Sequence, residues 1–158
     1  MQNETQAAHL AKMMQKHIHN TQYELALPLV SIRRSKLKKL SVNDVLLLDV
    51  SVLEFILLEG DVLCADLVLQ RVEGKDVVVI THLHTKMIVS NERYKYETIK
   101  LSFGKCQMKS FEVGDSLALT QFDLEKIMLI WDDKKIAEGS LVNVDHALAL
   151  KIMLVESV

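Results

Sequence analysis

Two histidines separated by one residue, His82 and His84, form one group in this chain that could do chemistry. They end the apolar segment "VVVITHLH" at 77–84, where a β-strand would place both imidazoles on one face. Such a pair could hold a metal ion, but a zinc site needs further protein ligands and the sequence offers no evident third one. We therefore expect exposed histidines at a strand end. A small β module that senses a ligand or a metal through these histidines is kept as the alternative to the assembly role described below.

A basic segment, "RRSKLKK" at 33–39, is the second candidate, because five of its seven residues are Lys or Arg. It could contact phosphate groups or anionic lipid. No aromatic residue is interleaved with the basic ones, which weighs against stacking on nucleic-acid bases. We expect a solvated loop or a contact for an acidic partner.

The other reactive residue types form no catalytic pattern. The sequence has no glycine-rich phosphate loop, no nucleophile motif and no Cys-x-x-Cys, and its acidic residues are scattered at turns. Cys64 and Cys106 are expected to be free, buried thiols, as is usual in a cytosolic protein. We expect a protein that is not an enzyme and that needs no metal or cofactor.

The elements that carry these residues are expected to be strands. Of 158 residues, 49% are hydrophobic and only 5% are aromatic, so the core must be aliphatic. Short Val, Ile and Leu runs between turn residues predict an all-β fold. The 19 basic and 21 acidic residues give a net charge of −2, which argues against a nucleic-acid binder. Without a long apolar run or a secretory leader, we expect a soluble cytoplasmic protein.

The chain divides into four segments. Residues 1–20 have apolar residues at helical spacing and predict a short amphipathic helix that must dock to be stable. Residues 21–84 and 96–158 are each a series of strands, joined by the polar junction 85–95. Pro28 predicts an edge or a break in the first strand. Turns are expected at 59–61, 73–76 and 132–135.

The two strand-rich segments contain an internal repeat. "LSVNDVLLL" at 40–48 aligns without a gap with "FEVGDSLAL" at 111–119, an offset of 111 − 40 = 71 residues. Asn43 and Gly114 occupy the same turn position, and both tolerate a left-handed backbone. A unit of about 65–70 residues buries too little surface to be stable alone. We therefore expect each half to complete the other's core, with chance similarity between aliphatic strands as the alternative.

Several motifs follow one another in residues 96–156: Gly114-Asp115, the alternating Leu117 and Leu119, a hairpin at Asp132-Asp133, "IAEGSLVNV" at 136–144 and "KI" at 151–152. With these motifs in this order, residues 96–156 resemble the SpoA domain, also called surface presentation of antigens. Residues 23–84 resemble it less closely, since "LCADLVL" stands where the family has "IA-x-G". The resemblance implies two tandem SpoA-type β-domains that form an intertwined intramolecular pseudo-dimer.

SpoA domains build cytoplasmic rings, so the resemblance also implies a function. The expected role is a non-enzymatic structural subunit of the C-ring of a flagellar motor, as in FliN, or of the sorting platform of a type III secretion system. Its place would be the cytoplasmic face of the inner membrane, at the basal body, as part of an oligomer. The implied partners are FliM/FliN-like or SctQ-like SpoA proteins and a FliH/SctL-like linker to the export ATPase.

The resemblance also implies a partner-binding surface. In FliN-like proteins an apolar surface near the "G-x-LV-x-V" strand receives the export linker. The matching residues here are Leu141, Val142 and Val144, with Asn143 at a position that is often apolar in the family. An ordinary core strand is the alternative interpretation of these residues.

Overall fold

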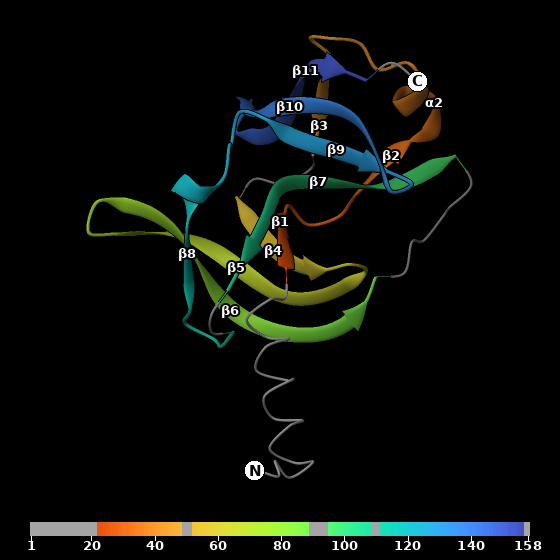
Figure 1. The fold of residues 1–158 in the computed structure, drawn as a ribbon. Helices are drawn as coiled ribbons and strands as arrows, with labels where there is room; N and C mark the ends of the chain where they lie inside the picture. The colour runs from red at the N-terminus through yellow and green to blue at the C-terminus, as the bar shows by residue number, and fades with distance from the viewer. Residues whose placement is uncertain (1–21, 49–51, 89–94, 109–110, 157–158) are drawn as a thin grey trace, which may run out of the picture.

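The structure, a computed structural model, describes residues 22–48, 52–88, 95–108 and 111–156. Strands make up 66% of the described residues and pair antiparallel in one eleven-stranded sheet, which confirms the predicted all-β class (Figure 1). No helix among the described residues is long and apolar enough to cross a membrane. The predicted helix at 1–20 lies outside the described residues.

Each half of the chain supplies a similar series of strands. The first half contains β1 (Gln22–Ala26), β2 (Val30–Arg33), α2 (Arg34–Lys38), β3 (Val45–Leu47), β4 (Glu54–Glu59), β5 (Val62–Val72) and β6 (Lys75–Met87). The second half contains β7 (Tyr96–Gln107), β8 (Ser116–Ala118), the 3-10 turn η1 (Leu119–Gln121), β9 (Ile127–Trp131), β10 (Lys134–Val144) and β11 (Ala147–Val155).

These elements test two predictions from the sequence, one about Pro28 and one about the basic segment. Pro28 lies between β1 and β2, so the predicted break is confirmed. The basic segment at 33–39 was expected to be a loop, and this was wrong: most of it forms α2, whose Leu37 is buried against the core. The predicted domain boundaries at residues 84 and 96 stay predictions. β6 continues past residue 84 to Met87.

The outermost strands of the sheet are exchanged between the two halves. The strand order is β3-β11-β10-β9-β7-β1-β4-β5-β6-β8, with β2 paired to β7 beside this path. Thus β3 of the first half pairs with β11 of the second, and β8 of the second half pairs with β6 of the first. In Figure 1, β8 is the edge strand next to β6. Along this path the counterparts in the two halves are β1 and β7, β3 and β8, β4 and β9, β5 and β10, and β6 and β11. Exchanging each strand for its counterpart gives the same order read from the other end.

The loops that precede the exchanged strands repeat the same hydrogen bonds. Ser41 N donates to Asp44 Oδ2 at 2.9 Å, and Glu112 N donates to Asp115 Oδ2 at 2.8 Å. Asn43 and Gly114 both have positive φ, 76° and 96°, as the shared turn requires. Asn43 N donates to the carbonyl oxygen of Ile152 at 2.8 Å, and Gly114 N donates to that of Ile80 at 2.9 Å. The repeated sequence therefore corresponds to repeated local structure.

The main core takes buried side chains from both halves. Its fully buried members include Leu25, Leu57, Ile80, Leu101, Leu129 and Leu150. A smaller cluster of Ala26, Ile56 and Leu58 lies apart from it. Because β3 and β8 carry their apolar residues across to the other half, neither half completes its packing without its neighbour. The core is largely aliphatic, as the composition predicted.

Gly139 lets β10 and β11 approach closely. A Cβ atom added at Gly139 would lie 2.5 Å from the carbonyl oxygen of Lys151 and 2.9 Å from Cγ of Leu150. Real Cβ atoms essentially never come so close to a backbone oxygen. The glycine of the "IAEGSLVNV" segment therefore has a packing reason.

We expect Gly139→Ala to lower the free energy of unfolding by about 1–3 kcal/mol, because the added methyl group must push β10 and β11 apart. Urea denaturation measures the loss. Ser140→Ala, one residue away on the same strand, is the control and should change the value by less than about 0.5 kcal/mol. Equal stability of the two variants would contradict the close-packing argument.

Candidate functional site

An apolar face covers the outer side of three strands near one end of the sheet. In the register of the strands, Leu47 lies beside Ala149, and Ala149 lies beside Val142. Leu47 is 56% exposed and Val144 is 37% exposed, which is unusual for large aliphatic residues grouped on a sheet. We call this surface the β3–β11–β10 face; its members are Val45, Leu47, Val142, Val144 and Ala147, which lie around the fully buried Ala149.

The alternation of side chains along each strand determines which residues lie in this face. In β3, Leu46 is 1% exposed and belongs to the main core, whereas Val45 and Leu47 on either side of it point away from the core. A shift of one residue in register would bury Val45 and Leu47 and expose Leu46. The hydrogen bonds of the 41–44 turn and the pairing with β11 hold the observed register. The exposed side chains therefore follow from how the core is built.

The structure separates the three residues that the sequence predicted as a partner-binding set. Leu141 packs against the main core. Val142 and Val144 lie on the opposite side of β10, in the β3–β11–β10 face. Val144 is 37% exposed, Val142 is partly buried, and Leu141 packs on the core side of the strand. The partner-binding role of all three residues stays a prediction.

Sequence reasoning missed Val45 and Leu47. They lie almost 100 residues before Val142, in the other half of the chain, and reach the face only because β3 crosses to β11. The repeat could have pointed to them once the exchange of β3 was known. No signal in the sequence specifies that exchange directly.

The other end of the sheet offers a useful comparison. The positions that correspond to Leu47 and Val142 are Ala118 and Gln70, which lie on either side of Val77. At these positions the outer side of β8, β6 and β5 has a smaller residue, Ala118, and a polar one, Gln70, in place of Leu47 and Val142. Val72, the counterpart of Val144, is 49% exposed, so the two ends differ at these two positions and share the exposed valine.

The histidines of β6 are engaged within the protein. His84 Nε2 lies 2.8 Å from Asp66 Oδ2, and His82 Nδ1 lies 3.2 Å from Thr81 Oγ1. Within the described part of the chain, no group of three or more His, Cys, Asp or Glu side chains is arranged to hold a metal ion. The pairing with Asp66 gives His84 a local structural explanation.

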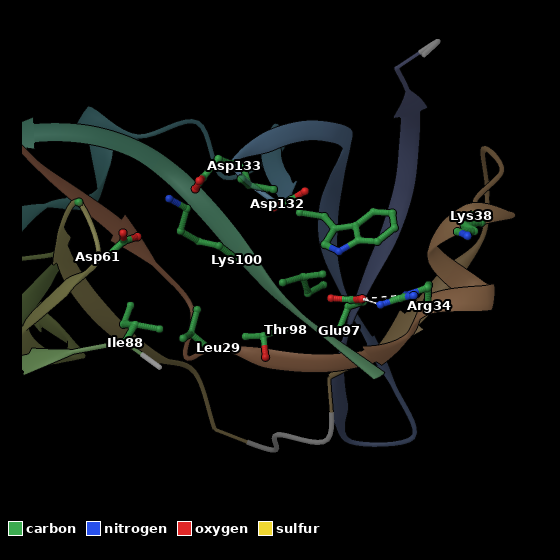
Figure 2. Close-up of a pocket in the computed structure, with 14 residues that line it drawn as sticks. Leu29, Arg34, Lys38, Asp61, Ile88, Glu97, Thr98, Lys100, Asp132 and Asp133 are labelled. Atoms are coloured by element: carbon green, nitrogen blue, oxygen red, sulfur yellow. Dashed lines mark hydrogen bonds and ion pairs between the residues drawn. The ribbon is translucent and has the colours of Figure 1, made fainter. Parts of the chain in front are cut away.

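A groove of about 650 Å³ lies beside α2, β7 and the β9–β10 turn (Figure 2). Figure 2 shows Arg34 joined to Glu97 at one end, with Lys100 and Asp133 toward the other. Its lining mixes both signs of charge, since Arg34, Lys38 and Lys100 face Asp61, Glu97, Asp132 and Asp133. Such a lining does not favour one class of charged ligand.

Part of the basic segment is committed to the protein itself. Glu97 is only 7% exposed and accepts a hydrogen bond from Arg34 Nε at 2.7 Å. This hydrogen bond lowers the pKa of the Glu97 carboxyl below its usual value, in spite of desolvation, and the Trp131 indole adds to the effect. Arg33 Nε donates to the Tyr96 hydroxyl at 3.3 Å. The lysines of the segment are its remaining basic groups.

The two cysteines are free and buried, as the sequence predicted. Cys64 is 6% exposed and Cys106 is 8% exposed. Burial alone raises the pKa of the Cys106 thiol to about 11. A thiol with this pKa is a poor nucleophile at neutral pH, which argues against a reactive role.

No protein-family model and no curated protein matches this chain. The functional argument therefore depends on the geometry of the described residues.

We predict that acid weakens the fold partly through Glu97. Because its pKa is lowered in the folded state, its stabilising effect is present above the unfolded pKa of about 4.3 and is lost as the pH falls through the folded pKa. Arg34→Gln should lower the unfolding free energy at pH 7, and the difference from the parent should shrink at acidic pH. A difference that is independent of pH would contradict the Arg34–Glu97 assignment.

We also predict that the thiols are protected. At pH 8 only about one thousandth of Cys106 would be thiolate, given a pKa of about 11. Labelling by a thiol reagent should therefore be slow in buffer and rapid in denaturant. Cys64→Ser isolates Cys106 for this measurement. Rapid labelling of the folded Cys64→Ser variant would show that Cys106 is not buried.

Proposed function

We propose that this chain is a non-enzymatic assembly subunit made of two SpoA-type β-domains, at 21–84 and 96–158, that form an intertwined pseudo-dimer within one chain. The observation that carries the proposal is the reciprocal exchange of β3 and β8 between the two halves. This exchange gives the internal repeat a physical purpose, because each half closes the other's core. Gly139, which lies in the segment that resembles the family motif, adds support through its close packing.

The proposed role is a structural one in the cytoplasmic ring of a flagellar motor or a type III secretion system, at the inner-membrane face. The partners would be FliM/FliN-like or SctQ-like SpoA proteins and a FliH/SctL-like linker to the export ATPase. Rigid sheets with exposed apolar faces suit such assembly, because they bury apolar area on binding without having to reorganise.

The β3–β11–β10 face is the proposed docking surface for the linker. Leu47 and Val144 are exposed aliphatic anchors, and such anchors tend to carry the binding energy in a small interface. Lys151 lies beside Val45 in the same register and would favour an acidic residue next to the partner's apolar ones. An amphipathic segment with that pattern fits the surface.

The alternative, a ligand- or metal-sensing β module that uses His82 and His84, is less well supported. His84 is already paired with Asp66, and a metal would have to displace that contact. Thermal-shift measurements with divalent metals and nucleotides separate the two proposals, because a ligand that binds the folded state raises its melting temperature.

We predict that Leu47→Asp weakens capture of the linker or SpoA partner from the same organism by at least about tenfold, since a charge would enter the centre of an apolar contact. Isothermal titration or co-purification with purified partner measures the effect. The matched control is Val72→Asp, an exposed valine at the opposite end of the sheet that is 49% exposed.

Both variants change a surface position, so both should remain folded by circular dichroism. Equal binding by Leu47→Asp, Val72→Asp and the parent would contradict the assignment of the β3–β11–β10 face. Failure of the parent to bind any SpoA or linker protein of its host would contradict the assembly role itself.

A further inference from the structure

A charged pair lies at the centre of the sheet, where β1 meets β7. Lys100 Nζ lies 2.6 Å from Glu24 Oε1, and Ser102 Oγ donates a hydrogen bond to Glu24 Oε2 at 2.7 Å. The Glu24 side chain is 12% exposed and that of Lys100 is 25% exposed. Both oxygens of the carboxylate therefore have a partner in a site that water reaches poorly.

Glu24 and Lys100 occupy equivalent positions in the two halves. Glu24 pairs with Leu58 of β4, and Lys100 pairs with Ile130 of β9. Leu58 and Ile130 correspond to each other, because 130 − 58 = 72 and the following strands β5 and β10 start at 62 and 134, which are also 72 apart.

Neighbouring pairs confirm the correspondence. Leu25 pairs with Leu57 as Leu101 pairs with Leu129. In the same way, Ala26 pairs with Ile56 as Ser102 pairs with Met128. The two members of the ion pair are thus the same structural position seen once in each half. In the ladder Glu24 is opposite Lys105, and its side chain reaches Lys100 beside the Ala26–Ser102 pair.

We propose that this pair makes the association of the halves heterotypic: a first half accepts a second half, of its own chain or of another copy, and rejects another first half. Two first halves would bring Glu24 against Glu24, and two second halves would bring Lys100 against Lys100. Like charges in a poorly hydrated position oppose such pairings, which is how related surfaces gain specificity. The partner that fits this surface is therefore the complementary half of a second copy.

The hydrogen bond from Ser102 makes the arrangement directional. The residue that corresponds to Ser102 in the first half is Ala26, which has no hydroxyl. A carboxylate at 24 is supported by Ser102, but a carboxylate moved to 100 would find no matching donor at 26. The arrangement with Glu at position 24 and Lys at position 100 should consequently be more stable than the reversed arrangement.

The test uses two full-length variants, Glu24→Lys and Lys100→Glu. Each alone places like charges together and should lower the urea midpoint of unfolding by roughly 1 M or more. When the two are unfolded together, mixed at high concentration and refolded, the first half of each chain can pair with the second half of the other. Both complementary pairs are then restored, so light scattering and native mass spectrometry should find a one-to-one heterodimer.

A chain that carries both substitutions keeps the test decisive if a single variant fails to fold. As a monomer it should recover at least half of the decrease in the urea midpoint. It should not recover all of it, because Ala26 offers no hydroxyl. Lys134→Glu, at an exposed lysine of β10, is the charge-reversal control and should neither lower the midpoint comparably nor form a heterodimer with Glu24→Lys.

Two results would overturn the inference: single variants as stable as the parent, or a refolded mixture that contains no heterodimer. Neither result bears on the proposed docking role, because the β3–β11–β10 face lies at another part of the sheet. The inference depends on the equivalence of the strands and not on the SpoA assignment.

Discussion

The exchange of β3 and β8 is the constraint on which the rest of this structure depends. Each half has one strand at the centre of the sheet, β1 or β7, and a β-hairpin, and each is completed by a short strand supplied by the other half. A half-chain of this size would leave much of its aliphatic core in water. The exchange removes that exposure and places Leu46 and Leu117, two buried leucines, in the packing of the opposite half.

The same constraint creates the surface that we assign to docking. Because β3 must present Leu46 to the core, its neighbours Val45 and Leu47 must face outward beside β11. At the other end β8 makes the same crossing with Ser116 and Ala118 in place of Val45 and Leu47, while Val72 of β5 is 49% exposed there. Repetition thus gives the sheet two similar ends that differ at a few positions.

Much of the fold could be predicted from the sequence, and the reason is local. The aliphatic composition, the break at Pro28 and the turn residues at 132–133 each act over a few residues, so their consequences were readable. The repeat of 40–48 at 111–119 also indicated that the halves share a core. The sequence did not predict which strands pair with the other half, because pairing between residues about 100 positions apart leaves no periodic signal. That gap explains why Val45 and Leu47 were not grouped with Val142 and Val144, which lie on the other side of β11 in the same face.

The most direct test of this account is the set of inter-strand nuclear Overhauser effects in the full-length protein. The account predicts contacts between backbone protons of Leu46 and Leu150, and between those of Val78 and Leu117, which join strands of opposite halves. Contacts of β3 only with strands of the first half, and of β8 only with strands of the second, would contradict the exchange and with it the shared core.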